Sequence, residues 1–273
     1  MAYPWLLWEN VLTSGTLTES SEMAASGLTA EKAVDWKPFV TNWSPSGVAG
    51  IHTLTVDLGS GLTGQPDTLC FIDHNLNSVT SGTGTYRVLY SDDGASFTQA
   101  FAAVVASGDL LEFKTFTLGA GHRYFQVEFS GVFHDYFRLG QVAVGRRLVF
   151  TEGLQPGFDP DREQALQSSP ISEAGVFLGA DVRRIKKQYQ LQWDGTPGIS
   201  ETFFDETVGL DMTTFWKTHA GRQAKPFFFA WDSDKADPEF CRVVPEFTYA
   251  APFGPTYLRR GLSLTFDVFT ETS

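Results

Sequence analysis

The sequence predicts a mainly β protein with two domains, and three observations support this prediction. Short runs of alternating apolar and polar residues recur along the chain, separated by Gly, Pro, Asp and Asn, which is the pattern of strands joined by turns. Aromatic residues make up 14% of the 273 residues, including 24 Phe and 7 Trp, so the chain can build a large core. Helical periodicity is scarce. Such regular short strands favour sandwiches or barrels.

The expected strands share this alternation of apolar and polar positions. A shorter one, Leu69–Ile72, follows a glycine-rich segment, and Ser91–Gly94 contains an Asp-Gly turn signal. The others are Thr53–Leu58, Tyr86–Ser91, Leu111–Leu118, Tyr124–Phe129, Gln141–Val144, Gln188–Trp193, Phe227–Trp231, Cys241–Tyr249 and Gly261–Phe269.

One segment, Asp211–Gly221, has the spacing of an amphipathic helix. Asp211 can cap its start and Gly221 can end it. Short helical turns are expected at Ser20–Ala25 and Thr29–Val34. The positions that fall at i, i+3, i+4 and i+7 are Met212, Phe215, Trp216 and His219.

A change in composition near Arg146–Gly153 predicts a domain boundary. The sequence before it is rich in Ser, Gly and Thr, whereas a loop-like stretch, Gly153–Asp161, leads into a more charged region. We therefore expect an N-terminal arm at residues 1–17, one β domain at residues 18–147 and a second β-rich domain at residues 148–273.

The charge balance excludes two classes of partner. With 32 acidic and 20 basic residues, the net charge is −12, so the chain should repel nucleic acid and anionic lipid. The basic runs Arg146-Arg147, Arg183–Lys187 and Arg259-Arg260 are short, and we interpret them as solvated strand edges or subunit contacts. No apolar stretch approaches the roughly twenty residues of a membrane span, so no membrane insertion is expected.

The N-terminal segment and the two cysteines predict a cytoplasmic chain. The N-terminal segment Met1–Trp8 lacks the basic residues of a signal peptide. Cys70 and Cys241 are far apart and flanked by apolar residues, so both are expected to be buried thiols and not a disulfide.

No motif indicates a cofactor, a metal or catalysis. Gly59–Gly64 matches a dinucleotide-binding pattern, but a strand follows it where a helix would be needed, so we interpret it as a loop. Asp232–Glu239 concentrates carboxylates but lacks the glycine and distal glutamate of a calcium loop, so a solvated hairpin tip is expected. The five histidines have no metal-ligand spacing, and no nucleophile motif is present.

Two loops are candidate contact surfaces. Trp36–Pro45 is rich in aromatic residues, which can stack on sugar rings or anchor a partner protein. The alternative is that these aromatics plug the open end of a sandwich. The second loop is His74–Gly84. The candidate contact residues are Trp36, Lys37, Phe39, Trp43, His74 and Asn75.

Residues from about Thr18 to Gly145 resemble the discoidin family of galactose-binding-like domains. The resemblance implies a jelly-roll β-sandwich. The terminal disulfide of that family is missing here, as expected for an intracellular version, and its ligand-binding loops vary too much to carry over. The matching motifs are Ala33–Trp36, Thr41–Trp43, Leu54–Gly59, Tyr86–Gly94, Arg123–Glu128 and Gly140–Gly145.

The second half resembles a domain of bacteriophage tail proteins. The likeness rests on Phe215–Lys217, Gly221–Phe229 and Leu262–Phe269. It implies a β-rich fold, split-barrel or sandwich-like, with one short helix. Together, the two halves are similar to distal-tail and minor-tail proteins, which form a ring in the baseplate with an accessory β domain facing outward.

We therefore expect a non-enzymatic structural component of a phage-like tail tip, assembled in the host cytoplasm and then part of the virion. Its expected partners are further copies of itself in a ring, other tail proteins and, in addition, a host cell-surface glycan. The long apolar strands Gln188–Trp193 and Gly261–Phe269 agree with this hypothesis, because a closed ring covers exposed strand edges. The alternatives are a stand-alone carbohydrate-binding, lectin-like module and, third, a glycosidase with an accessory domain.

Overall fold

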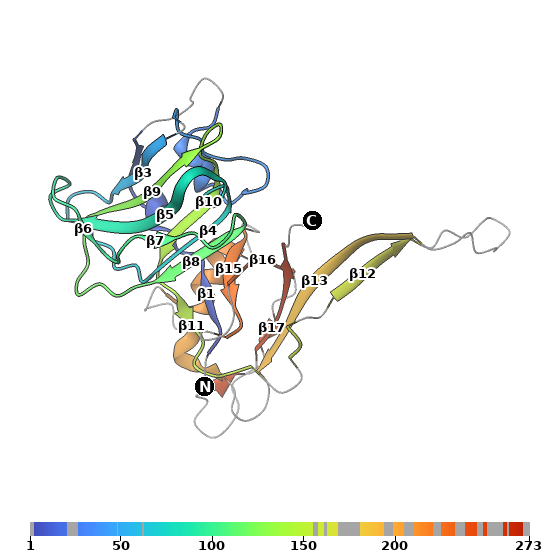
Figure 1. Cartoon of the computed structure of the whole chain (residues 1–273). Coiled ribbons are helices and arrows are strands. Elements are labelled where there is room, and N and C mark those ends of the chain that lie inside the picture. Colours follow the sequence, from blue (N-terminus) through green and yellow to red (C-terminus); the bar gives the residue numbers. More distant parts are fainter. Residues whose placement is uncertain are drawn as a thin grey trace. The chain divides into compact units, whose positions relative to one another are not determined.

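The computed structural model divides the chain into two compact units, residues 7–147 and residues 1–6 together with 148–273 (Figure 1). We call them the jelly-roll unit and the C-terminal unit. Residues 7–17, expected in an arm, thus belong to the jelly-roll unit. The structure describes residues 3–20, 27–47, 49–61, 63–154, 158–160, 163–168, 181–193, 199–204, 210–220, 225–232, 238–244, 248–249, 259–260 and 262–269.

The jelly-roll unit consists of two antiparallel sheets, which confirms the expected fold. The larger sheet has the order β2-β3-β9-β5-β6, with β7 also paired to β5, and the smaller has the order β10-β4-β8. The strands of the larger sheet are β2 (Thr16–Glu19), β3 (Ala49–Asp57), β9 (Tyr124–Phe133), β5 (Val79–Ser91), β6 (Thr98–Gln99) and β7 (Val104–Val105). Those of the smaller are β10 (Leu139–Gly145), β4 (Thr68–His74) and β8 (Leu111–Thr115).

The core of this unit lies between the two sheets. Strand β9 buries Phe125, Val127 and Phe129, and the intervening side chains are more exposed, as its alternating sequence predicts. Phe129 meets Phe71 of the opposite sheet edge to face, with ring centroids 5.3 Å apart. Strands β4 and β10 are buried at every position, so no alternation is visible in their sequences.

The connections at one end of the sandwich, together with the last two residues of β4, form what we call the loop end: residues 27–47, 73–78, 106–110 and 134–138. Strands β4 and β9 end there, while β3, β5, β8 and β10 begin there. The 3-10 turn η3 (Ala30–Ala33) lies in the first of these loops, where a helical turn was predicted. The other expected turn, Ser20–Ala25, falls almost entirely outside the described residues.

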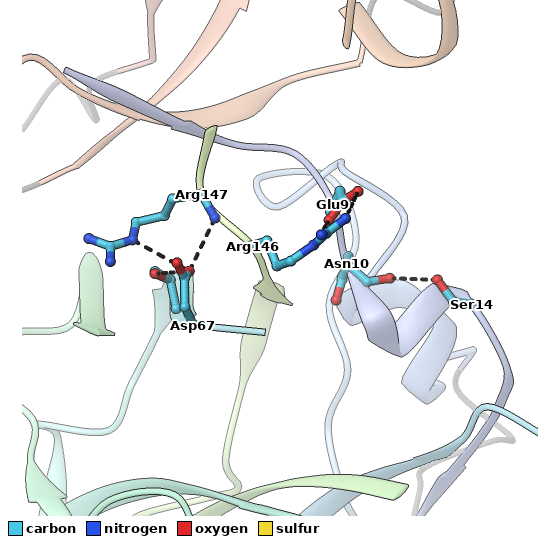
Figure 2. A network of polar contacts seen from close by, with 7 residues as sticks. Glu9, Asn10, Ser14, Asp67, Arg146 and Arg147 are labelled. Carbon is cyan, nitrogen blue, oxygen red and sulfur yellow. Dashed lines mark hydrogen bonds and ion pairs between the residues drawn. The ribbon is translucent and has the colours of Figure 1, made fainter. Parts of the chain in front are cut away.

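The chain enters and leaves the jelly-roll unit at the opposite end, which we call the terminal end. After η1 (Val11–Thr13) the chain runs into β2. Figure 2 shows Arg146 directed at Glu9 and Arg147 at Asp67. Asn10 joins the two segments further, because its side chain donates to the Val142 carbonyl at 2.8 Å.

The C-terminal unit is built on a sheet with the order β11-β1-β15-β16-β19-β13-β12, and β17 also pairs with β19. Strands β14 and β18 pair separately. The bounds are β1 (Trp5–Leu7), β11 (Leu148–Val149), β12 (Glu163–Ser168), β13 (Asp181–Trp193), β14 (Ile199–Ser200), β15 (Phe227–Ala230), β16 (Glu239–Val243), β17 (Thr248–Tyr249), β18 (Arg259–Arg260) and β19 (Leu262–Val268). A 3-10 turn, η4 (Glu201–Phe204), precedes the helix.

The predicted helix is present as two short pieces. Helix α1 (Met212–Phe215) continues into the π-helical turn η6 (Trp216–Ala220). The Asp211 carboxylate accepts from the Thr214 backbone N–H at 2.8 Å, so the predicted N-cap is confirmed. Gly221 lies outside the described residues, as does most of the carboxylate-rich segment Asp232–Glu239.

Several sequence expectations can be compared with the described residues. Cys70 and Cys241 are both buried free thiols, as predicted. No helix among the described residues is long and apolar enough to cross a membrane. Within the same residues, no group of three or more His, Cys, Asp or Glu side chains is arranged to hold a metal ion. The strand expected at Cys241–Tyr249 is instead two strands, β16 and β17.

Candidate functional site

The loop end contains all six sequence-predicted contact residues, but three of them point inward. Trp43 is fully buried, His74 is fully buried and Trp36 is 7% exposed. Their placement is that of the alternative interpretation, in which the aromatics close the end of the sandwich. Lys37 and Phe39 are exposed and Asn75 is half-buried, so only these three can reach a ligand from the predicted set.

Backbone strain marks this end of the unit. Among the described residues, Trp36 and Asp73 are the non-glycine residues with positive φ, at 64° and 57°. The left-handed region costs a residue with a Cβ about 1 kcal/mol or more, and such residues collect at ligand-binding sites. Both lie at the loop end: Trp36 is in its longest loop, and Asp73 is the next-to-last residue of β4.

A polar group built from two chain segments, residues 73–75 and 136–138, lies at the loop end. The Arg138 guanidinium pairs with the Asp73 carboxylate at 3.0 Å. The Arg138 backbone N–H donates to the Asn75 side-chain oxygen at 2.7 Å, and the Asn75 amide donates to the Tyr136 carbonyl at 2.9 Å. The Asp73 side chain is 11% exposed whereas the Arg138 side chain is 45% exposed, so the carboxylate orients a guanidinium that still faces water.

The loop that carries Phe39 is fixed by hydrogen bonds to Asp35 and by close packing on Gly140 of β10. The Asp35 carboxylate accepts from the Lys37 backbone N–H and the Thr41 hydroxyl, both at 2.9 Å. Gly140 lies directly beneath, and a Cβ at this glycine would come within 2.5 Å of the Pro38 carbonyl oxygen and 2.8 Å of Asp73 Cβ. The loop therefore packs against the Asp73 pair, and it presents Phe39 at 44% exposure.

The turn at residues 74–78 is held from both sides. The Asp109 carboxylate accepts from the Asn77 backbone N–H at 2.6 Å and from the Ser78 hydroxyl at 2.5 Å. On the inner side, His74 Nδ1 accepts from the Leu76 backbone N–H at 3.2 Å. Burial lowers the pKa of His74 to about 4, so the ring is neutral near pH 7.

A buried carboxylate fixes the fourth loop. Glu112 of β8, 6% exposed, accepts from the backbone N–H groups of Ser107 and Gly108 and from the Ser107 hydroxyl. The Tyr86 hydroxyl donates to its other oxygen at 3.2 Å. Burial, followed by the neighbouring Glu112, raises the pKa of the Tyr86 phenol, which keeps the phenol protonated as a donor.

The site therefore has a defined composition. We call Phe39, Asp73, Asn75, Tyr136 and Arg138 the loop-end site. Two aromatic side chains, Phe39 at 44% and Tyr136 at 41% exposure, accompany fixed donors and acceptors. Such a surface can stack on an apolar ring face while hydrogen-bonding the groups around it.

Sequence reasoning missed Asp73, Tyr136 and Arg138. Asp73 carries no signal in the sequence, because it ends the apolar run of a strand that is buried at every position. A signal for the other two exists in the polar and aromatic run His134–Arg138 between two apolar strands. The predicted loop His74–Gly84 is shorter than expected, because β5 begins at Val79.

Comparisons with known proteins give structural likeness only. No protein-family model matches the sequence, and no curated protein matches it. Similar solved structures include chitosan-binding module 1 of a chitosanase/glucanase from Paenibacillus sp. IK-5, at 20% identity and a TM-score of 0.40; the match covers 50% of this chain and 98% of the module. The CBM32 of AlyQ in complex with 4,5-unsaturated mannuronic acid is 21% identical, with a TM-score of 0.38. That match covers 54% of this chain and 98% of the CBM32. CpGH89CBM32-5 from Clostridium perfringens, in complex with GalNAc-β-1,3-galactose, is 16% identical, with a TM-score of 0.40. That match covers 49% of this chain and 96% of the neighbour.

Proposed function

We propose that the jelly-roll unit is a non-catalytic carbohydrate-binding module and that the loop-end site is where it holds a sugar. The observation that supports this most directly is the joint placement of Phe39 and Tyr136 with the Asp73–Arg138 pair on one solvent-facing end. A pyranose has an apolar C–H face that can stack on an aromatic ring, and it has equatorial hydroxyls that need planar donors and acceptors.

The polar groups of the site suit hydroxyl recognition because their orientation is set before binding. Arg138 is oriented by Asp73, and Asn75 is oriented by backbone groups of the loop after β9. Little side-chain entropy then remains to be lost on binding. The strained φ of Asp73 supports the same proposal, because strain persists where the surrounding contacts over-determine a conformation.

The test is direct binding with matched variants. The full chain is titrated by calorimetry with chitosan oligosaccharides, GalNAc-β-1,3-galactose and unsaturated mannuronic acid, which bind the similar modules, and is screened on a glycan array. Phe39→Ala and Tyr136→Ala should each weaken binding about tenfold, a loss of roughly 1.4 kcal/mol. Tyr3→Ala is the matched control, since Tyr3 is 36% exposed and lies in the C-terminal unit.

Two outcomes would count against the module. Absence of binding to every glycan would overturn the proposal. Binding that survives both loop-end variants would place the sugar elsewhere.

A second candidate role is the tail-structural one expected from the sequence, and one feature of the C-terminal unit favours it. Strand β13 is 13 residues long; residues 188–193 pair with β19, whereas residues 181–187 pair with β12. The sheet therefore continues into a two-stranded extension among the described residues. Two isolated strands are marginally stable in water, so a second copy lying against them would stabilise them. Electron microscopy and mass photometry of the purified chain would decide: rings support the role, and a monomer at every concentration contradicts it.

A further inference from the structure

His74 occupies an unusual position at the loop end. It is the last residue of β4, is fully buried, and lies beside Phe71, with ring centroids 4.7 Å apart. Its Nδ1 accepts a hydrogen bond from the Leu76 backbone, so the ring proton resides on Nε2. Nε2 is buried and has no hydrogen-bond partner among the described residues. A neutral imidazole tolerates this arrangement, whereas an imidazolium would place a second unpaired N–H and a charge there.

The charged groups around His74 come from three segments. Glu112 of β8 and Asp109 of the preceding loop favour the protonated ring, and Arg138 disfavours it. Tyr86 of β5 adds no charge, because its phenol donates to Glu112. Burial outweighs these charges, so the ring stays neutral in the closed arrangement.

The bond from Leu76 connects His74 to the loop-end site. The turn it closes contains Asn75, whose side chain holds both Tyr136 and Arg138 through their backbones. Nδ1 can accept only while it carries no proton. If a proton binds there, the inner support of the turn is lost, and Asn75 can no longer fix the loop after β9.

We infer that His74 is a proton-sensitive latch: the neutral ring closes the turn at residues 74–78, and protonation of Nδ1 opens the turn and lowers the affinity of the loop-end site. The affinity part of this inference rests on the proposed carbohydrate-binding function. The opening of the turn does not, and it is measured without a ligand.

The size of the effect follows from linkage. The ring has a pKa of about 4 in the closed turn and its ordinary value of 6.5 when the turn is open to water. The open form therefore binds protons more strongly, and the closed form is favoured at neutral pH. Between about pH 7 and about pH 5 the opening equilibrium should rise roughly 20-fold.

The first experiment measures amide hydrogen exchange at Leu76 in the full chain, corrected for the intrinsic pH dependence of exchange. The protection of this amide should fall roughly 20-fold from about pH 7 to about pH 5 in the native protein. In His74→Gln the side-chain oxygen can still accept from Leu76 but does not titrate, so its protection should be constant over this range. His122→Gln, at the terminal end, is the matched histidine control and should behave as the native protein does.

Asp109 also supports the turn through its carboxylate. The His74→Gln variant retains Asp109 and therefore separates the two contributions. Equal loss of protection in the native protein and in His74→Gln would overturn the latch. If the variant does not fold, nitrogen chemical shifts of the native histidine rings decide instead. A His74 ring protonated only on Nε2 at about pH 6 supports the latch, and ordinary titration near 6.5 refutes it.

Sugar binding is measured separately with the glycan identified by the array. Affinity that falls with acid in the native chain but not in His74→Gln completes the inference. A turn that opens with acid, in a chain that binds no sugar, would retain the latch and refute only the carbohydrate-binding proposal. A turn that opens while affinity stays constant would refute the coupling.

Discussion

Replacing Trp43 with alanine distinguishes a core residue from a sugar-binding residue. The indole is fully buried and packs against Phe137 and Phe129, with ring centroids 5.8 and 6.5 Å away. Truncating a buried Trp costs about 4 kcal/mol, from lost burial and from the cavity left behind. The backbone bridge from residue 43 to Leu139 remains available in the variant, so the loss is that of the side chain. For a unit of about 140 residues this corresponds to a fall of roughly 12 °C in Tm.

The assay is calorimetric unfolding of the full chain, together with sugar binding well below the transition. Trp43→Ala should lower the Tm of the jelly-roll unit and leave sugar affinity nearly unchanged while the unit is folded. A variant with the native Tm that has lost binding would refute the reasoning, because the indole would then act as a ligand contact. The Phe39→Ala variant should show the reverse: a native Tm with weakened binding.

Three further predictions address the frame of the site and its acid stability. Gly140→Ala should shift the loop that carries Phe39, because the new Cβ would lie 2.5 Å from the Pro38 carbonyl oxygen. We expect the free energy of unfolding in urea to fall by about 2 kcal/mol and sugar binding to weaken. Unchanged binding would show that this loop does not position the site. Glu112→Gln removes the charge and puts an amide NH2 group in place of one carboxylate oxygen, so either the three donors of Ser107 and Gly108 or the Tyr86 hydroxyl lose their acceptor. The variant should lose about 2 kcal/mol in the same assay, and a native midpoint would contradict this. The Arg123 guanidinium holds the pKa of Asp57 at about 2, below its ordinary 3.8. The stability that the ionised Asp57 contributes is therefore present above about pH 4 and is lost as the pH falls through about 2. In acid titrations followed by circular dichroism, Asp57→Asn should remove that part of the pH dependence, and an unchanged acid transition would show that the Asp57–Arg123 pair does not contribute to it.

The strands of the jelly-roll unit could be predicted because their sequences alternate and turn residues separate them. Strand β9 illustrates this, since every second side chain is buried where the sequence is apolar. The cap at Asp211 was predictable for the same reason, because one side chain and one amide three residues later define it. In both cases the determining contacts are local or strictly periodic.

The loop-end site was only partly predictable because long-range contacts create it. Arg138 and Asp73 are 65 positions apart, and no spacing rule connects them. The direction of Trp43 was not determined by sequence either: an aromatic residue in a loop can point outward to a ligand or inward to a core. What decides is the bridge between residue 43 and Leu139, which directs the indole into the sandwich.

The arrangement at the terminal end makes the jelly-roll unit a single inserted segment that can be removed from the chain as a whole. The chain leaves the C-terminal unit after Leu6 and re-enters it at Leu148, and these two residues are antiparallel partners in β1 and β11. Paired strands lie about 5 Å apart, so a two-residue hairpin loop could replace residues 7–147. Excision should therefore leave a foldable remainder, and grafting residues 7–147 between two adjacent strands of another scaffold should transplant the module intact.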